Sequence, residues 1–185
     1  MDVREAILDS AEARMRAGGF HACSFREIAG DVGIKSASVH YHFPTKAELG
    51  AALVTRYEAR VLALFGDPDD RRDLADKLDC VRNVFRTGLR QGNGMCLCGV
   101  LATEMRSLPS AVAGATSHYF VACNDWLRRA FAHARVPHPE RRALHITALL
   151  QGAMLQAVSL NDPAAFDTAL RGLHAETQTR QPVLE

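Results

Sequence analysis

The chain has 185 residues, enough for one large domain or two small ones. Hydrophobic residues make up 48% and charged residues 23%, values typical of a packed globular protein rather than a disordered one. The 22 lysines and arginines against 21 acidic residues leave a formal net charge of +1, which excludes a protein that coats nucleic acid or anionic lipid by bulk charge.

The sequence also lacks the signals of several other classes of protein. No apolar run approaches the ~20 residues of a membrane-spanning helix, and the N-terminus carries acids where a secretion signal is basic and apolar. We therefore expect a cytoplasmic protein with no membrane partner. The 5 cysteines are expected to be mostly free thiols. Common metal, nucleotide and nucleophile motifs are absent, so we expect no metal, no cofactor and no enzymatic activity.

Helical spacing of apolar residues begins at the N-terminus. Residues spaced four apart from Val3 to Met15 predict a first helix that ends at the glycines 18–19. A capping box at Ser24 starts a short helix over 24–32, because a serine hydroxyl and a glutamate three residues later satisfy two free backbone N–H groups. A turn over 33–35 leads to a second short helix over 36–43, which Pro44 ends.

The remaining elements are longer and also helical. A second capping box at Thr45 begins a helix whose apolar residues step by four as far as Phe65. The residues 66–69 combine a helix stop with a turn and are the best candidate boundary. Further helices are expected over roughly 70–91, 96–106, from 109 onward, 139–160 and 163–176, with breaks at 92–94, 137–139 and 161–163 and a frayed tail over 178–185. The fold class is therefore all-α.

Two short helices joined by a tight glycine-containing turn form a helix-turn-helix, the unit that places its second helix in the DNA major groove. Between Gly33 and Lys46 the sequence has two lysines and no acid, which suits a contact with phosphates. Thr45 and Lys46 begin a helix, where free N–H groups and the helix dipole attract a phosphate. The alternative is a generic three-helix subdomain with His40 and His42 on its surface.

The stretch from Phe25 to Leu49 resembles the signature of TetR-family transcriptional repressors. It contains a capped helix with Ile-Ala, a glycine turn, a recognition helix that ends in Tyr-His-Phe, and a Thr-Lys-x-x-Leu start to the next helix. Lys35 and His40 depart from the usual Ser or Thr and the usual Tyr. The resemblance implies an N-terminal three-helix DNA-binding domain over 1–48 and a C-terminal ligand-binding and dimerisation bundle over 49–185.

The resemblance also implies which side chains meet DNA. Short or planar hydrogen-bonding side chains on the second helix face the groove, and the helix starts and neighbouring basic residues contact the backbone. The predicted DNA-binding residues are Ser24, Arg26, Lys35, Ser36, Ser38, His40, Tyr41, His42, Thr45 and Lys46. The core side of the recognition helix is expected to comprise Val39 and Phe43, packed against Ile28, Ala29 and Ile34.

The helix expected over 139–160 is apolar on more than one side. One line runs through Ala143, Ile146 and Leu150, and a second includes Leu144 and Leu155. Such a helix must be covered on more than one side. We expect it to pack on the bundle and on a second copy, as TetR-like proteins do, which implies a homodimer on a palindromic operator of double-stranded DNA. The alternative is that both lines belong to the core of a monomer.

The resemblance further implies a bundle pocket whose ligand moves the DNA-binding heads apart. Bulky residues near helix breaks or bundle centres, a histidine and two thiols are the candidate lining; each could instead be plain core. These predicted ligand-binding residues are Phe85, Met95, Cys96, Cys98, Met105, His118, Tyr119, Trp126 and Met154. They predict a small effector that is partly hydrophobic, or an electrophile that reacts with a thiol near a helix N-terminus.

Two cysteines that are two residues apart point in opposite directions on a helix, so Cys96 and Cys98 are expected to form neither a metal site nor an easy disulfide. The prediction is thus a ligand-responsive repressor. One alternative is an all-α enzyme that uses these thiols with Glu104 and His118. The other is an interaction protein whose apolar helix binds a different partner.

Overall fold

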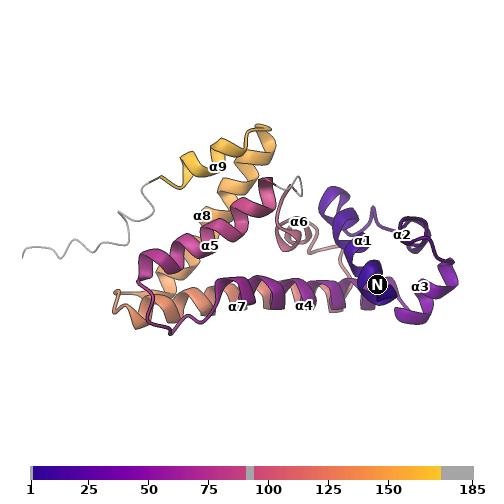
Figure 1. Cartoon of the computed structure of the whole chain (residues 1–185), viewed down its shortest axis with the longest axis horizontal. Helices are drawn as coiled ribbons and strands as arrows, with labels where there is room; N and C mark the ends of the chain where they lie inside the picture. Colours follow the sequence, from indigo (N-terminus) through magenta and orange to yellow (C-terminus); the bar gives the residue numbers. More distant parts are fainter. Residues whose placement is uncertain (1, 91–93, 172–185) are drawn as a thin grey trace, which may run out of the picture.

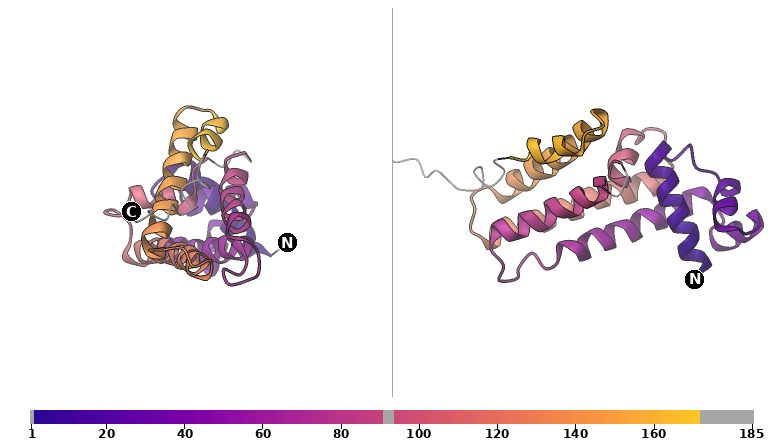
Figure 2. Two further views of the ribbon diagram at one scale, coloured as in Figure 1. Left: turned by 90° about the vertical axis from the view of Figure 1, so that its left-hand side faces the viewer. Right: turned by 45° about the horizontal axis from the view of Figure 1, so that its top comes forward.

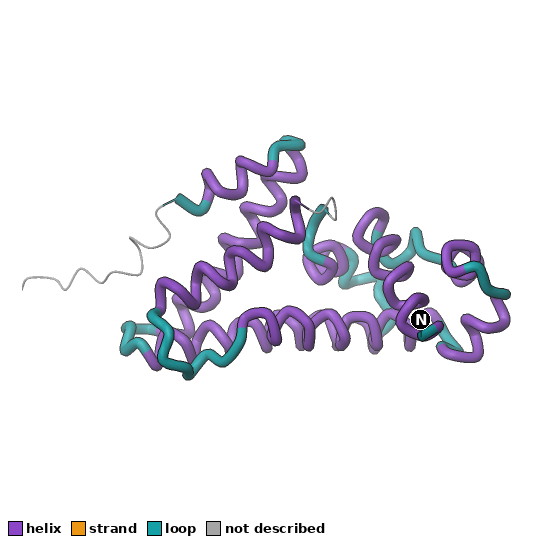
Figure 3. The backbone as a smooth tube through the Cα atoms, in the orientation of Figure 1, coloured by secondary structure: helices purple, strands orange, loops and turns teal. Residues whose placement is uncertain are grey.

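The computed structural model describes residues 2–90 and 94–171, and the regular elements in these ranges are all helices (Figures 1 and 3). In chain order they are α1 (Val3–Gly18), α2 (Phe25–Val32), α3 (Ser36–His42), α4 (Lys46–Phe65), α5 (Leu74–Gly88), α6 (Leu97–Thr103), α7 (Ser110–His133), α8 (Pro139–Ser159) and α9 (Pro163–Ala169). The described helices include none with both the length and the apolarity that crossing a membrane requires. The predicted all-α class is confirmed.

Helices α1, α2 and α3 gather at one end of the molecule and form the head (Figure 1). The capping box at the start of α2 is present: the Glu27 N–H donates to the Ser24 hydroxyl at 3.3 Å, and the Ser24 N–H donates to the Glu27 carboxylate at 2.9 Å. Gly33 ends α2 with a φ of 73°, a left-handed conformation that glycine adopts without strain. Ile28 and Val39 are fully buried beneath the turn. The helix-turn-helix is therefore in place.

An ion pair ties α1 to α2 inside the head. The Asp31 carboxylate accepts hydrogen bonds from Arg14 Nε at 2.6 Å, from Arg14 Nη2 at 2.8 Å and from the Ser10 hydroxyl at 2.6 Å. These donors stabilise the ionised form and lower the pKa of Asp31 to about 2, with the Arg14 bonds as the largest cause. The contact fixes the orientation of α2 on α1.

Helix α4 leaves the head and runs into the bundle, where it lies along α7 (Figures 1 and 2). The bundle also contains α5 and α8, and α9 packs on α8. The Phe65 and Trp126 rings contact each other with centroids 5.2 Å apart, and Trp126 Nε1 donates to the Gly66 carbonyl at 2.7 Å. Since α4 is continuous through residues 48–49, the boundary expected between the two domains lies inside a helix, and α4 connects the head to the bundle.

Three helices differ in length from those expected. Helix α5 begins at Leu74 rather than near 70, because the preceding residues form turns held by the Lys77 ammonium, which donates to the Pro68 and Asp70 carbonyls at 2.7 and 2.8 Å. Helix α6 covers less than 96–106, since Glu104 leaves the helix and accepts from the Phe20 N–H at 2.8 Å.

The last helix, α9, ends at Ala169, which is earlier than the expected 176. The residues 172–176, the tail beyond them, and most of the break predicted at 92–94 lie outside the described residues. Helix α8 agrees with the sequence: the prediction of 139–160 compares with Pro139–Ser159.

Candidate nucleic-acid interface and bundle cavity

Helix α3 combines a buried back with an exposed front. Val39 is fully buried and Phe43 nearly so, as the sequence predicted, and both anchor α3 in the head. On the front, the Tyr41 side chain is 85% exposed, and its ring meets the edge of the His42 ring with centroids 5.3 Å apart. Lys35 and Ser36 are exposed at the start of the helix, and Ser38 is half-buried. A short helix with this profile can enter a major groove.

His40 has a structural contact that the sequence did not indicate. Its ring packs on Phe25 of α2 with centroids 4.6 Å apart, and its Nδ1 lies 3.4 Å from the Pro44 carbonyl. The residue is still exposed. His40 therefore holds α3 against α2 and the following turn in addition to its predicted place at the DNA surface.

The hydroxyls at the starts of α2 and α4 are engaged in capping. The Ser24 hydroxyl donates to the Glu27 carboxylate at 2.7 Å, and the Thr45 hydroxyl donates to the Glu48 carboxylate at 3.1 Å. Each also accepts the backbone N–H of its glutamate partner. Both residues are exposed, as is Arg26. Ser24 and Thr45 thus orient the two helix starts where a phosphate is expected.

Lys46 is half-buried at the junction of the head with α4. Its ammonium lies 4.6 Å from the centroid of the Phe20 ring and donates to the His21 carbonyl at 3.4 Å. The cation is therefore held close to the protein surface by a cation–π contact. The structure brings this residue and the other predicted DNA-binding residues together on α2, α3 and the start of α4.

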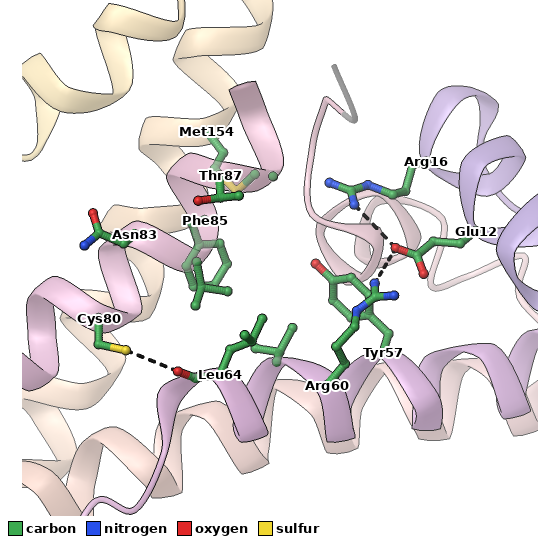
Figure 4. A pocket seen from close by; sticks show the side chains of 13 residues that line it. Glu12, Arg16, Tyr57, Arg60, Leu64, Cys80, Asn83, Phe85, Thr87 and Met154 are labelled. Carbon is green, nitrogen blue, oxygen red and sulfur yellow. Dashed lines mark hydrogen bonds and ion pairs between the residues drawn. The ribbon is translucent and has the colours of Figure 1, made fainter. Parts of the chain in front are cut away.

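A cavity of about 650 Å³ lies between α1, α4 and α5, with Met154 of α8 at its inner side (Figure 4). The volume is in the range of small-molecule sites, roughly 300–1,000 Å³. Its wall is apolar where Val61, Leu64 and Phe85 line it. Phe85 and Met154 are the two predicted ligand-binding residues that line this cavity.

The other end of the cavity is charged, and the sequence did not indicate it. Glu12 of α1, only 9% exposed, accepts from Arg60 Nη2 of α4 at 2.6 Å and from Arg16 Nη1 at 3.4 Å (Figure 4). The Arg60 guanidinium lies 5.3 Å from the centroid of the Tyr57 ring, which also lines the cavity. The spacing of Glu12 and Arg16 places both on one face of α1, but only the packing of α4 brings Arg60 to them.

Several predicted ligand-binding residues lie elsewhere. Trp126 is buried and bonded to the Gly66 carbonyl, while Met95 and Met105 are partly buried against the core. His118 is on the outer surface of α7, where its Nδ1 lies 2.8 Å from the Glu58 carboxylate. These four residues do not line the 650 Å³ cavity.

A small interior space of about 10 Å³ lies between α5, α7 and α8. It is lined by residues that include Phe85, Tyr119 and Gln151. Both the amide nitrogen and the amide oxygen of Gln151 are shielded from solvent with no hydrogen-bond partner in the described chain. Burying an amide in an apolar interior without hydrogen-bond partners lowers the free energy of unfolding. Phe85 also lines the larger cavity, so its ring stands between the two spaces.

The two neighbouring cysteines are buried and contact each other. Cys96 is the residue before α6 rather than part of it, so the expectation of opposed side chains, which required both in one helix, is wrong. Burial raises the pKa of Cys96, but hydrogen bonds from Cys98, from the Tyr119 and Tyr57 hydroxyls and from the Gly99 N–H outweigh it and lower this pKa below its ordinary value. Burial and the Cys96 thiolate raise the pKa of Cys98.

The other residues considered for an all-α enzyme are engaged in structural contacts. The Glu104 carboxylate accepts from the Phe20 backbone, and His118 pairs with Glu58 at the surface. The contacts of the Cys96 thiol come from hydroxyls and a second thiol, which are not general bases for a nucleophile at neutral pH.

Comparison with known proteins agrees with the geometry. The chain matches the family model described as bacterial regulatory proteins of the tetR family over residues 7–53, and the tetracyclin repressor-like C-terminal domain over 101–176. A TetR-family transcriptional regulator from Agrobacterium tumefaciens is 27% identical with a TM-score of 0.87, over 96% of this chain and 98% of that one. A TetR transcriptional regulator from Legionella pneumophila is 26% identical with a TM-score of 0.91, over the same shares. No curated protein matches. The chain belongs to the TetR family of transcriptional regulators.

Proposed function

We propose that this regulator is a ligand-responsive repressor that binds a palindromic operator as a homodimer and is released by a small effector. The observation that carries the proposal is α3 in a helix-turn-helix, where it presents the exposed Tyr41 and the half-buried His42 while its buried side packs in the head. Continuous α4 joins this head to a bundle that has a cavity of ligand size. The proposal therefore assigns DNA recognition to one end and effector binding to the other.

Dimerisation is supported by an uncovered apolar stripe on α8. Leu144, Ala148, Leu155 and Val158 lie on one side of α8, about 120° around the helix from its buried residues at 100° per residue. Leu144 is 62% exposed and Leu155 is 55% exposed. An exposed apolar face on a long helix favours burial against a partner. In a two-fold symmetric dimer, both copies contribute the same stripe to the interface, and this interface sets the separation of the two heads.

An effector in the 650 Å³ cavity touches both parts of the molecule. Glu12 and Arg16 belong to α1 of the head, while Tyr57 and Arg60 belong to α4. An effector releases DNA only if it binds more tightly to the arrangement of heads that does not fit the operator. A ligand wedged between α1 and α4 satisfies this condition, because its contacts depend on how these helices lie.

An electrophilic effector has a specific observation in its favour. The Tyr57 hydroxyl donates to Cys96 Sγ at 3.4 Å, and the Tyr57 side chain also lines the cavity. Cys96 therefore lies directly behind the cavity wall. Its lowered pKa increases the thiolate fraction, which is the form that reacts with electrophiles.

A gel shift with the DNA upstream of the protein's own gene tests the proposal. We expect specific binding that weakens as salt rises, because phosphate contacts release counterions. Tyr41→Ala should abolish the specific complex, whereas Val121→Ala, at an exposed site on α7, should leave it intact. Absent or salt-insensitive binding by the wild type contradicts the repressor and favours the enzyme or interaction protein.

A further inference from the structure

We infer that the effector of the cavity between α1, α4 and α5 is an amphipathic anion, with an acidic head at Arg16 and Arg60 and an apolar body along Leu64 and Phe85. The inference deepens the proposed function, since it names the chemical class of the effector. The bulky apolar residues predicted from the sequence account only for the apolar part of this site and not for its arginines.

The positive charge at the polar end exceeds the negative charge. Glu12 is the one carboxylate among the described residues that line the cavity, and both Arg16 and Arg60 share its Oε1 atom. Arg56 reaches the other carboxylate oxygen at 3.5 Å, but Glu5 and Asp9 of α1 already neutralise it at 2.8 and 2.9 Å. Two guanidinium groups therefore compete for one carboxylate.

One of the two guanidinium groups is poorly hydrated, whereas the Arg60 side chain is 45% exposed. The side chain of Arg16 is only 8% exposed, and besides Glu12 it donates from Nε to the Met95 carbonyl at 3.0 Å. A largely buried cation that shares its counterion is incompletely compensated. An arriving carboxylate gains charge-assisted hydrogen bonds from a planar guanidinium, whereas an alcohol gains only neutral ones and an ammonium is repelled.

The rest of the cavity suits a hydrocarbon or aromatic body. Leu64, Val61, Phe85 and Met154 line it beyond the arginines, and the remaining polar side chains there, such as Asn83, are neutral. Figure 4 shows Glu12, Arg16 and Arg60 at one side of the opening and Phe85 and Met154 across from them. A ligand with one acidic end and one apolar end therefore matches both parts of the lining.

Binding of an effector at this site also changes the contact between the head and α4. The Glu12–Arg60 pair joins α1 to α4, and an anion that binds Arg60 takes the place of Glu12. The remaining ion pairs between the two helices are then those of Arg56, which lies one turn back along α4. An anionic effector thus weakens the junction between the head and α4 by competition, without needing any movement of the bundle core.

Calorimetric titration with octanoate, octanol and octylammonium tests the inference, since the three probes share one tail. The acid and alcohol of a phenyl-terminated tail repeat the comparison with another shape. We expect each acid to bind about 10-fold or more tightly than its alcohol, and octylammonium to bind weakest. Arg60→Gln should weaken octanoate about 10-fold and leave octanol unchanged, and Arg60→Lys should restore part of the loss. Glu12→Gln should strengthen octanoate, because it removes the competing carboxylate.

Arg128→Gln is the matched control, since Arg128 is a surface residue of α7 paired with Asp125; it should change neither affinity. In the wild-type protein, the carboxyl pKa of 13C-labelled octanoate should fall on binding, a result that needs no variant to fold. Acids that bind no better than alcohols, no binding of either acid, or an unchanged carboxyl pKa overturns the inference. If the acid preference fails while operator binding persists, only the effector class is wrong. If operator binding fails while the acid preference persists, the repressor is wrong and the anion site stands.

Discussion

Replacing Leu155, in the C-terminal half of the α8 stripe, with glutamate probes the proposed dimer. Complete burial of a leucine is worth about 1.5–3 kcal/mol, so covering a side chain that is 55% exposed is worth about 1 kcal/mol. Each copy of a two-fold dimer buries its own Leu155, so the two side chains together contribute about 2 kcal/mol per dimer. The introduced carboxylates add desolvation without a partner and raise the cost further. We therefore expect the dimer dissociation constant to rise about 100-fold or more.

Sedimentation velocity across a concentration series measures this constant directly. Val121→Glu places the same charge at a similarly exposed site, on the side of α7 opposite its buried residues, and should leave the dimer unchanged. Far-ultraviolet circular dichroism confirms that both variants fold. A Leu155→Glu protein that still forms a dimer of wild-type affinity refutes the assignment of the interface to this stripe. The same variant should also lose operator affinity, because a single head contacts only one half-site.

Four further experiments address the head, the loop before α5 and the thiols. Lys46→Ala should weaken binding to all DNA sequences about equally and reduce the slope of log affinity against log salt by roughly 2 per dimer, which a salt titration of gel shifts measures. The pKa of Asp31 is lowered from 3.8 to about 2, so its contribution to stability is present above pH 3.8 and lost as the pH falls through about 2; Asp31→Asn should remove that part of the acid unfolding curve. Lys77→Met should cost about 2 kcal/mol, since one buried and one partly buried carbonyl lose their donor, and should lower Tm by about 4–8 °C in calorimetry. N-ethylmaleimide should release operator DNA from Cys80→Ser, which lacks the partly exposed thiol, but not from Cys96→Ser; equal release from both contradicts an electrophile sensor at Cys96.

Local chemistry explains why the head was predictable from the sequence. The capping box at Ser24, the left-handed turn at Gly33 and the stop at Pro44 each involve residues within a few positions of one another. Such short-range hydrogen bonds and backbone preferences do not depend on the rest of the fold. The buried back of α3 followed in the same way, because Val39 and Phe43 are one helical turn apart.

The charged end of the cavity was not predictable, since it depends on contacts between distant residues. Glu12 and Arg60 are 48 positions apart, and each alone resembles an ordinary solvated residue of an amphipathic helix. Of the bulky residues predicted from the sequence as ligand-binding, only some line the cavity, for a related reason. Phe85 lines the cavity, whereas Trp126 is buried with its indole N–H on the Gly66 carbonyl, and both have the same apolar character in the sequence. Only the packing distinguishes core from lining.

In the proposed repressor, the near-zero net charge and the control by a ligand are connected. An acid-free segment with only two lysines predicts that one head alone binds DNA weakly, so in this proposal specific binding requires two heads that meet two half-sites together. When one head is misplaced, the complex loses the benefit of the second contact. The Glu12–Arg60 pair joins α1 of the head to α4, so we expect an effector that breaks this pair to displace the head. A protein with a strongly basic surface would hold DNA in either arrangement, and the same cavity would then give an effector little control.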